Sequence, residues 1–136
     1  MKPEEFKRIT DDLKKRKIPP EVKRAVTAML DKKAERVMVL KLKGINEITD
    51  FMVIGSGNSP RQNAAISDEV QGTLRKEFKR KAFSVEGERE AEWILLDYID
   101  FIVHIFSEES RKKYTLEKLW MDAKRYDFYA DQESQG

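Results

Sequence analysis

The sequence predicts a single α/β domain in which a mixed β-sheet is flanked by helices. Its 136 residues match the length of one domain, and a hydrophobic fraction of 40% is enough for a core. Amphipathic segments with helical spacing alternate with short apolar runs in the order helix, strand, strand, helix, three strands, helices. Elements in this order pack as helices on a sheet.

Residues 1–20 are predicted to form an N-terminal extension with a helical arm. Phe6, Ile9 and Leu13 follow helical spacing among charged residues. Pro19 and Pro20 then stop the helix, because proline cannot continue one. We therefore expect an appended helix on a stiff link, and a domain that stays folded when residues 1–18 are removed.

The domain is predicted to span residues 21–127 and to begin with a helix over residues 21–36. Residues 37–42 form the first predicted strand. Residues 51–54 form the second, and this run is apolar at every position. A strand without polar alternation is typical of the centre of a sheet that is covered on both faces.

The next helix has the clearest start signals in the chain. Ser59 suits the N-cap, Pro60 the first helical position and Gln62 the third, which completes a capping box. Its buried stripe is expected at Ile66, Val70, Leu74 and Phe78. The segment 55–60, Gly-Ser-Gly-Asn-Ser-Pro, joins a strand to this helix and is interpreted first as a tight turn, with anion binding as the alternative.

Three further strands are predicted over residues 82–85, 93–98 and 101–106, and a tight hairpin would make the last two antiparallel. Ser107 is expected to cap a short helix. Thr115 would cap a second helix, with Leu116, Leu119, Trp120 and Ala123 on one face. Residues 128–136 are expected to be a disordered tail.

Composition limits the classes of function. The chain has no cysteine, so it has neither disulfides nor thiolate metal ligands. It shows no membrane-length apolar run and no signal-peptide pattern, which predicts a cytoplasmic or organelle-matrix protein without membrane contact. Residues 1–43 carry fourteen basic and seven acidic residues, whereas residues 84–100 carry six acidic and one basic. These are either two electrostatic surfaces or ordinary solvated faces.

Catalytic patterns are missing from the places where they would be expected. A Gly-Ser after a strand is similar to the start of nucleotidyltransferase sites, but those need paired carboxylates soon afterwards to hold Mg²⁺. Here Asn58, Ser59, Pro60 and Arg61 follow instead. We predict no catalytic residue, no metal site and no cofactor, and keep a nucleotidyltransferase-type enzyme only as a remote alternative.

The remaining candidates are a histidine, aromatic residues and a basic cluster. His104 lies inside an apolar strand, so a hydrogen-bonded structural role is favoured over a role at a binding surface. Trp93, Tyr98 and Trp120 are either core residues or interface anchors. The cluster at residues 79–81, Lys-Arg-Lys, either complements a helix end or contacts RNA phosphates.

From about Glu21 to Asp127 the chain resembles the ribosomal silencing factor family, also called Iojap-like. The matching landmarks are Thr49 to Ile54, Ser59 to Ile66, Val85 to Gly87, Glu92 to Tyr98, Val103 to Phe106, Arg111, Tyr114, and Leu116 to Trp120. Each landmark alone is weak, and their order and spacing over about a hundred residues carry the resemblance.

The resemblance implies a nucleotidyltransferase-like fold without catalytic residues. It further implies binding to the large ribosomal subunit through ribosomal protein L-fourteen, which blocks joining of the small subunit and represses translation when nutrients are scarce. The residues that the resemblance assigns to this contact are Trp93, Ile94, Leu95, Asp97, Tyr98, Asp100, Leu116, Glu117, Lys118, Leu119 and Trp120.

Several alternatives stay open at this point. An assembly factor for the large subunit would use the same contact, and peripheral contact with ribosomal RNA or a homodimer is compatible with the sequence. The acidic segment 84–100 is consistent with the resemblance, because ribosomal proteins are generally basic. One position departs from the family: Ile99 stands where a hairpin glycine is usual, so we expect a wider turn or one of another type.

Overall fold

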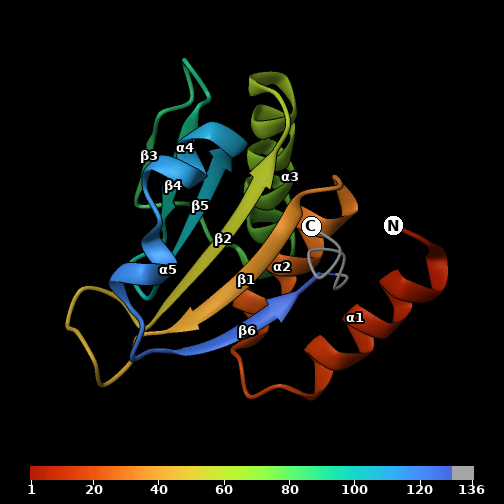
Figure 1. The fold of residues 1–136 in the computed structure, drawn as a ribbon, viewed down its shortest axis with the longest axis vertical. Coiled ribbons are helices and arrows are strands. Elements are labelled where there is room, and N and C mark those ends of the chain that lie inside the picture. The colour runs from red at the N-terminus through yellow and green to blue at the C-terminus, as the bar shows by residue number, and fades with distance from the viewer. Residues whose placement is uncertain (130–136) are drawn as a thin grey trace.

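The computed structural model describes residues 1–129, apart from the side chains of Glu117 and Leu119, and shows one six-stranded sheet flanked by helices (Figure 1). The strands are β1 (Glu35–Lys41), β2 (Phe51–Gly57), β3 (Ser84–Glu86), β4 (Trp93–Asp97), β5 (Phe101–Ser107) and β6 (Lys124–Phe128). The helices are α1 (Pro3–Lys15), α2 (Pro20–Asp31), α3 (Pro60–Phe78), α4 (Glu108–Lys113) and α5 (Leu116–Leu119). The predicted fold class is confirmed.

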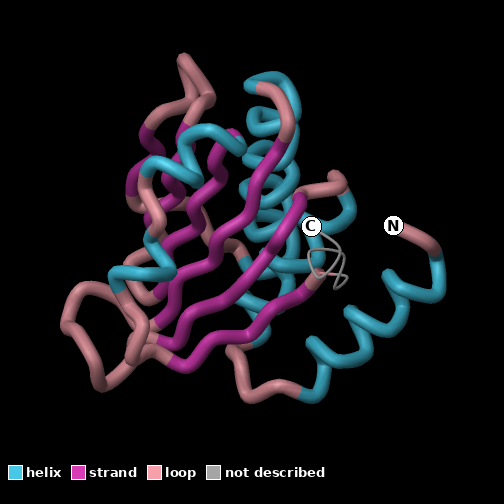
Figure 2. The backbone as a smooth tube through the Cα atoms, in the orientation of Figure 1, coloured by secondary structure: helices cyan, strands magenta, loops and turns pink. Residues whose placement is uncertain are grey.

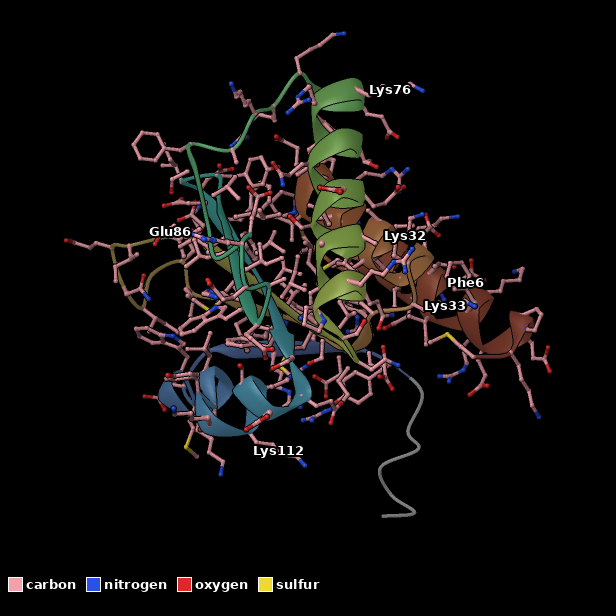
Figure 3. The ribbon with its side chains drawn as sticks, turned by 90° about the horizontal axis from the view of Figure 1, so that it is seen from above. Phe6, Lys32, Lys33, Lys76, Glu86 and Lys112 are labelled. Atoms are coloured by element: carbon pink, nitrogen blue, oxygen red, sulfur yellow. The ribbon has the colours of Figure 1, made fainter. Side chains whose placement is uncertain are left out.

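The sheet is mixed, with strand order β3-β4-β5-β2-β1-β6. Its central pair, β2 and β5, is parallel, with Val53 opposite Val103, and the other neighbouring strands are antiparallel. Helices α2 and α3 cover one face, with α1 beside α2, whereas α4 and α5 lie on the other face (Figures 1 and 3). The magenta strands in Figure 2 show the sheet's twist between these layers.

Each face of the sheet has its own apolar cluster. On the side of α1, α2 and α3 the larger cluster includes Val39, Val53, Ile66, Val103 and Ile105. On the other side a smaller cluster is formed by Met38, Leu40, Leu42, Met52, Ile54 and Phe106. Alternation along each strand sends neighbouring side chains to opposite clusters, so β2 is buried along its whole length, as the sequence predicted.

Helix α3 begins as predicted and α2 ends earlier than predicted. The Ser59 hydroxyl accepts a hydrogen bond from the Gln62 amide at 3.0 Å, and Pro60 opens the helix. Helix α2 stops at Asp31 rather than at residue 36, because Lys33 takes a left-handed φ of 62° and donates its amide to the Leu30 carbonyl. This αL turn is a standard helix end.

The predicted glycine turn at residues 55–57 is instead the end of β2. A methyl group on Gly55 would lie 2.4 Å from Cε of Met29 in α2. A methyl on Gly57 would meet the side chain of Asn63 in α3. The two glycines therefore allow helices on this face to approach the central strand closely.

The first helix forms, but it packs against the domain. Ile9 and Leu13 of α1 are buried in the larger cluster, and so is Ile18 in the link that follows. Phe6 packs against the cluster from its edge. This packing conflicts with an arm that can be removed without loss of stability.

The C-terminal part holds a strand that the sequence reasoning missed. Residues 124–128 form β6, which pairs with β1 in an antiparallel register that places Tyr126 opposite Val39. Tyr126 and Phe128 are buried, so the predicted tail boundary at residue 128 falls inside a strand. The rest of that tail, residues 130–136, lies outside the described residues.

The hairpin between β4 and β5 is tight, so the wider turn considered for Ile99 does not form. Tyr98 donates its amide to the Phe101 carbonyl at 2.9 Å, which leaves only Ile99 and Asp100 in the loop. Ile99 takes a φ of 76°, the conformation for which glycine is the usual residue. A left-handed φ costs a non-glycine residue roughly 1–2 kcal/mol, and a β-branched side chain is among the least tolerant.

We predict that Leu13→Ala lowers the free energy of unfolding by about 2–4 kcal/mol, because it opens a cavity in a cluster that α1 shares with α2 and β6. Denaturant unfolding monitored by circular dichroism measures this loss. Arg8→Ala, on the exposed side of the same helix, is the matched control and should change stability by less than about 0.5 kcal/mol. Equal stability of the two variants would mean that α1 is a separable arm after all.

Candidate functional site

The sheet face that carries α4 and α5 also presents several of the residues singled out by the sequence. On β4, Trp93, Leu95 and Asp97 point to this side, and each is half-buried. On β5 they lie opposite Phe106, His104 and Ile102 in the antiparallel register. We call the surface formed by Trp93, Leu95, Asp97 and Ile102 the open face.

Trp93 is held in place by an aromatic cluster and one hydrogen bond. Its indole N–H donates to Nδ1 of His104 at 2.9 Å. Its ring centroid lies 4.9 Å from that of Phe106 and 4.9 Å from that of Tyr114, which follows α4. Tyr114 itself is exposed, so the stack reaches from the core to the surface.

His104 is a structural residue, as favoured from the sequence. It is buried, and burial lowers its pKa from 6.5 to about 4. Because Nδ1 accepts the Trp93 bond, the neutral ring carries its proton on Nε2. Protonation of Nδ1 would remove the acceptor, so the neutral imidazole is the form that fixes the Trp93 ring.

Helices α4 and α5 fold back over the sheet and bring separate parts of the predicted site together. Trp93, Leu116 and Trp120 all pack against the smaller apolar cluster. Arg111 of α4 is buried and donates to the Ser56 hydroxyl at 3.0 Å, which anchors the helix to β2. The Trp93 strand and the Leu116–Trp120 motif therefore lie against the same apolar cluster.

Two of the predicted contact residues do not reach the surface. Ile94 is fully buried and Tyr98 nearly so, and both belong to the larger cluster under α2 and α3. The Tyr98 ring stacks on Phe101 with centroids 4.9 Å apart, and burial raises the pKa of its hydroxyl. Both are core residues in this structure, and their contact with a partner stays a prediction.

The other predicted residues divide by exposure. Asp100 and Lys118 are exposed, and Leu95 and Asp97 are half-buried on the open face. Glu117 and Leu119 belong to α5, but their side chains lie outside the described part of the chain. Ile102 and Tyr114 were not predicted as site residues; alternation along β5 places Ile102 beside Asp97 and could have indicated it.

Arg80 has a structural role that the sequence did not indicate. Its guanidinium donates to Glu21 at 2.6 Å, to the Tyr98 carbonyl at 2.8 Å and to Asp100 at 2.7 Å. The Asp100 carboxylate, and after it that of Glu21, raises the pKa of Arg80, and the guanidinium also lies over the Tyr98 ring. Arg80 thus ties the end of α3 to the hairpin, and is not available for RNA as the cluster at residues 79–81 suggested.

The loop before α3 uses its own polar groups. Asn58 donates its amide to Oε1 of Gln62 at 2.7 Å, and the Gln62 amide bonds to Ser59. Gln62 also donates to the Lys32 and Lys33 carbonyls, which joins the loop to the end of α2. The tight turn is therefore confined to Asn58 and Ser59, and these bonds favour a turn over an anion cradle.

Acidic residues line the edge of the sheet at β3 and β4, where Glu86 lies opposite Leu95 of the open face. Glu88, Glu90 and Glu92 lie in the exposed connection between these strands, and Glu88 accepts a hydrogen bond from Gln71 of α3 at 3.4 Å. Figure 3 places Glu86 at this edge of the sheet and Lys76 on α3, on the helical side.

Within residues 1–129 no cluster of three His, Asp or Glu side chains is placed to hold a metal ion. Over the same residues, no helix combines the length and apolar character that a membrane span requires.

The fold and this surface define an α/β domain with one sheet face left partly open between two short helices and an acidic edge. A family model described as "Ribosomal silencing factor during starvation" matches residues 15–136. The chain belongs to this ribosomal silencing factor family, RsfS.

Relatives in bacteria and in mitochondria support this assignment. A protein of Halalkalibacterium halodurans called ribosomal silencing factor RsfS is 45% identical over 102 residues, covering 73% of this chain and 84% of the relative. The protein of the same name in Bacillus subtilis is 39% identical, covering 75% and 86%. A mouse protein called "Mitochondrial assembly of ribosomal large subunit protein 1" is 29% identical, covering 70% of this chain and 42% of the relative.

A solved structure agrees on the fold. A crystal structure of a Bacillus halodurans protein superposes with a TM-score of 0.65 at 41% identity, covering 73% of this chain and 91% of the other. The predicted family is therefore confirmed, and so is the general connection with the ribosome.

We predict that stability falls as the pH is lowered from about 6.5 to about 4, in a way that depends on His104. The folded pKa of His104 lies below its unfolded value of 6.5, so the unfolded chain binds the proton more tightly and protonation favours unfolding. The full loss is roughly 3 kcal/mol, from about 1.4 kcal/mol per pKa unit.

Denaturant unfolding at a series of pH values measures this loss, with His104→Gln as the reference because Gln keeps an acceptor for Trp93 without titrating. His104 is the one histidine of the chain, so the difference between the two profiles isolates it. Superimposable profiles for wild type and variant would contradict the assignment.

Proposed function

We propose that this protein represses translation by binding the large ribosomal subunit through ribosomal protein L-fourteen and blocking access of the small subunit. Family membership supports the connection with the ribosome. The observation that carries the proposal is the open face, where a fixed indole lies next to an acidic edge. Such a surface suits a basic protein partner, which charge steers and aromatic rings anchor.

The contact set in this proposal follows the geometry. It comprises Trp93, Leu95, Asp97, Asp100, Leu116, Lys118 and Trp120. Tyr114 and Ile102 are added to it. Ile94 and Tyr98 support this surface from the core. Glu117 and Leu119 remain in the proposal on the basis of the family resemblance alone. The site of action is the cytoplasm, where the subunits join.

The mechanism in this proposal is occupancy. Where nucleotidyltransferases need carboxylates after Gly55 and Ser56, this chain has Asn58, Ser59, Pro60 and Arg61. Stacking against the buried Phe106 and the exposed Tyr114 fixes the Trp93 side chain before binding, so little conformational entropy is lost on contact. Inhibition of subunit joining should then be stoichiometric with large subunits and independent of nucleotide.

An assembly role for the large subunit is the second candidate. The observation that favours it is the name of the mouse relative, which assigns that protein to mitochondrial large-subunit assembly. Both roles need the same contact. Sucrose-gradient sedimentation of purified subunits separates them: a silencing factor keeps mature subunits apart, whereas a dedicated assembly factor binds immature particles and leaves mature subunits free to join.

We predict that Trp93→Ala weakens binding to the large subunit by on the order of 2 kcal/mol, a loss of about 30-fold in affinity. The variant loses the indole ring that packs on the smaller apolar cluster and stacks with the exposed Tyr114. Cosedimentation over a concentration series measures the dissociation constant.

Phe83→Ala is the matched control for this variant. Phe83 is 73% exposed and directly precedes β3, outside the open face, so its removal should leave affinity unchanged. Trp93→Phe retains a stacking ring but loses the bond to His104. Its affinity for the large subunit should lie between those of Trp93→Ala and Phe83→Ala. Wild-type affinity in a folded Trp93→Ala protein would remove the open face from the interface.

We also predict that Glu88→Lys combined with Glu92→Lys slows association and weakens its dependence on salt. Exposed charges steer encounters and are screened beyond about 8–10 Å at physiological ionic strength. Stopped-flow association with large subunits at several salt concentrations gives the rate constants.

Glu4→Lys combined with Asp68→Lys changes the net charge equally, at exposed positions on α1 and α3, and provides the control. A similar rate loss in both double variants would indicate that net charge, rather than the acidic edge, governs the encounter.

A further inference from the structure

Three isoleucines are exposed at the end of the sheet where β2 and β5 begin. Ile48 is 71% exposed, Ile99 60% and Ile45 45%. Ile45 and Ile48 lie in the loop between β1 and β2, and Ile99 lies at the tip of the β4–β5 hairpin. Figure 1 shows the β1–β2 loop projecting at this end of the molecule, below α5.

Hydrogen bonds join the loop and the hairpin into one unit. The Thr49 hydroxyl donates to the Ile99 carbonyl at 3.0 Å, and the Asp50 amide donates to the Asp100 carbonyl at 3.0 Å. Within the loop, the Asn46 side chain accepts from the Ile48 amide at 3.0 Å. The isoleucines are therefore carried on an ordered surface, and not on independent loops.

The backbone of Ile99 is strained, and its side chain gains little packing within the domain. Its φ of 76° suits glycine, yet the position carries a β-branched side chain, and that side chain is mostly in solvent. The surrounding bonds enforce the turn: the Ile99 amide donates to Asp97 at 2.7 Å, and the Asp100 amide to the Tyr98 carbonyl at 3.0 Å. Inside the described chain, the exposed side chain offers nothing that offsets the strain.

The surroundings of this patch indicate the partner it fits. Asp97 belongs to the open face and bonds directly to the Ile99 amide, so the two surfaces are continuous. Carboxylates at Glu47, Asp97 and Asp100 border the isoleucines, together with the exposed Lys43 of the same loop, and Arg80 neutralises part of the Asp100 charge. An apolar centre whose rim carries more carboxylates than free cations matches a basic protein surface that offers an apolar spot.

We infer that Ile99 and Ile48 form an apolar extension of the contact surface and are buried against the basic large-subunit protein on binding; this inference rests on the proposed function. The strained side chain is then retained for the complex rather than for the free domain. Stability and affinity should respond in opposite directions when Ile99 is replaced, which a purely structural role would not produce.

The test compares three variants at residue 99. Ile99→Gly and Ile99→Asn both tolerate the left-handed conformation, so each should raise Tm by about 2–4 °C. Both remove the apolar contact and should weaken binding to the large subunit about 5- to 10-fold. Ile99→Val keeps the β-branched apolar side chain and the strain, and should leave Tm and affinity close to wild type.

Ile48→Asn provides a second, independent variant, because it changes the exposed side chain and leaves the Ile99 backbone alone. It should weaken binding by a similar factor without the rise in Tm. Differential scanning calorimetry gives Tm, and cosedimentation with purified large subunits gives the dissociation constants.

The outcomes separate this inference from the proposed function. Wild-type affinity in both Ile99→Gly and Ile48→Asn, with wild-type protein binding normally, overturns the inference and leaves the proposed function intact. Failure of the wild-type protein to bind large subunits overturns both. Dissociation of a wild-type dimer by Ile99→Gly in sedimentation equilibrium would assign the patch to a second copy of the chain, and would also overturn the inference.

Discussion

The parallel pairing of β2 with β5 is the constraint on which the rest of the structure depends. Parallel neighbours are joined by a crossover, and here the chain leaves β2 through α3 and returns through β3 and β4 before it reaches β5. Both faces of β2 are consequently buried, which requires helices on each side. Gly55 and Gly57 allow Met29 and Asn63 to approach this strand where larger residues would collide.

The two faces then take different roles. Long helices α2 and α3 close one face, with ion pairs such as Arg24–Glu77 between them. Among the described residues, the helices on the other face are the short α4 and α5, which leave Leu95, Asp97 and Ile102 half-exposed. The unequal cover of the sheet produces the open face, and the bond from Trp93 to buried His104 fixes the largest side chain on it.

The hairpin at residues 98–101 links the core to this surface. Arg80 holds its Tyr98 carbonyl and Asp100 carboxylate, while Tyr98 itself packs under the helices. A two-residue turn held from both sides tolerates an unfavourable backbone at Ile99, because the neighbouring bonds outweigh the local strain. Stability of the core and shape of the surface are thereby coupled at one short turn.

The sequence by itself determined the fold class, the order of most elements and the family, because periodicity, caps and the order of motifs are local properties. Ser59 and Ser107 cap α3 and α4 as predicted. The sequence could not reveal β6, because Lys124–Phe128 becomes a strand through pairing with β1. Neither could it show that α1 packs against the core through Ile9 and Leu13.

For the candidate site, the alternation of side chains along a strand showed that Trp93 and Tyr98 point to opposite sides of the sheet. It did not show which of the two sides is covered by helices. Only the placement of α2 and α3 decided that Tyr98 is buried and Trp93 is not. Likewise, the sequence shows Arg80 as one of three consecutive cations, and only the folded chain places its guanidinium beside Asp100 of the hairpin. Burial and partnership depend on contacts between residues far apart in the chain, and such contacts exist only in the tertiary structure.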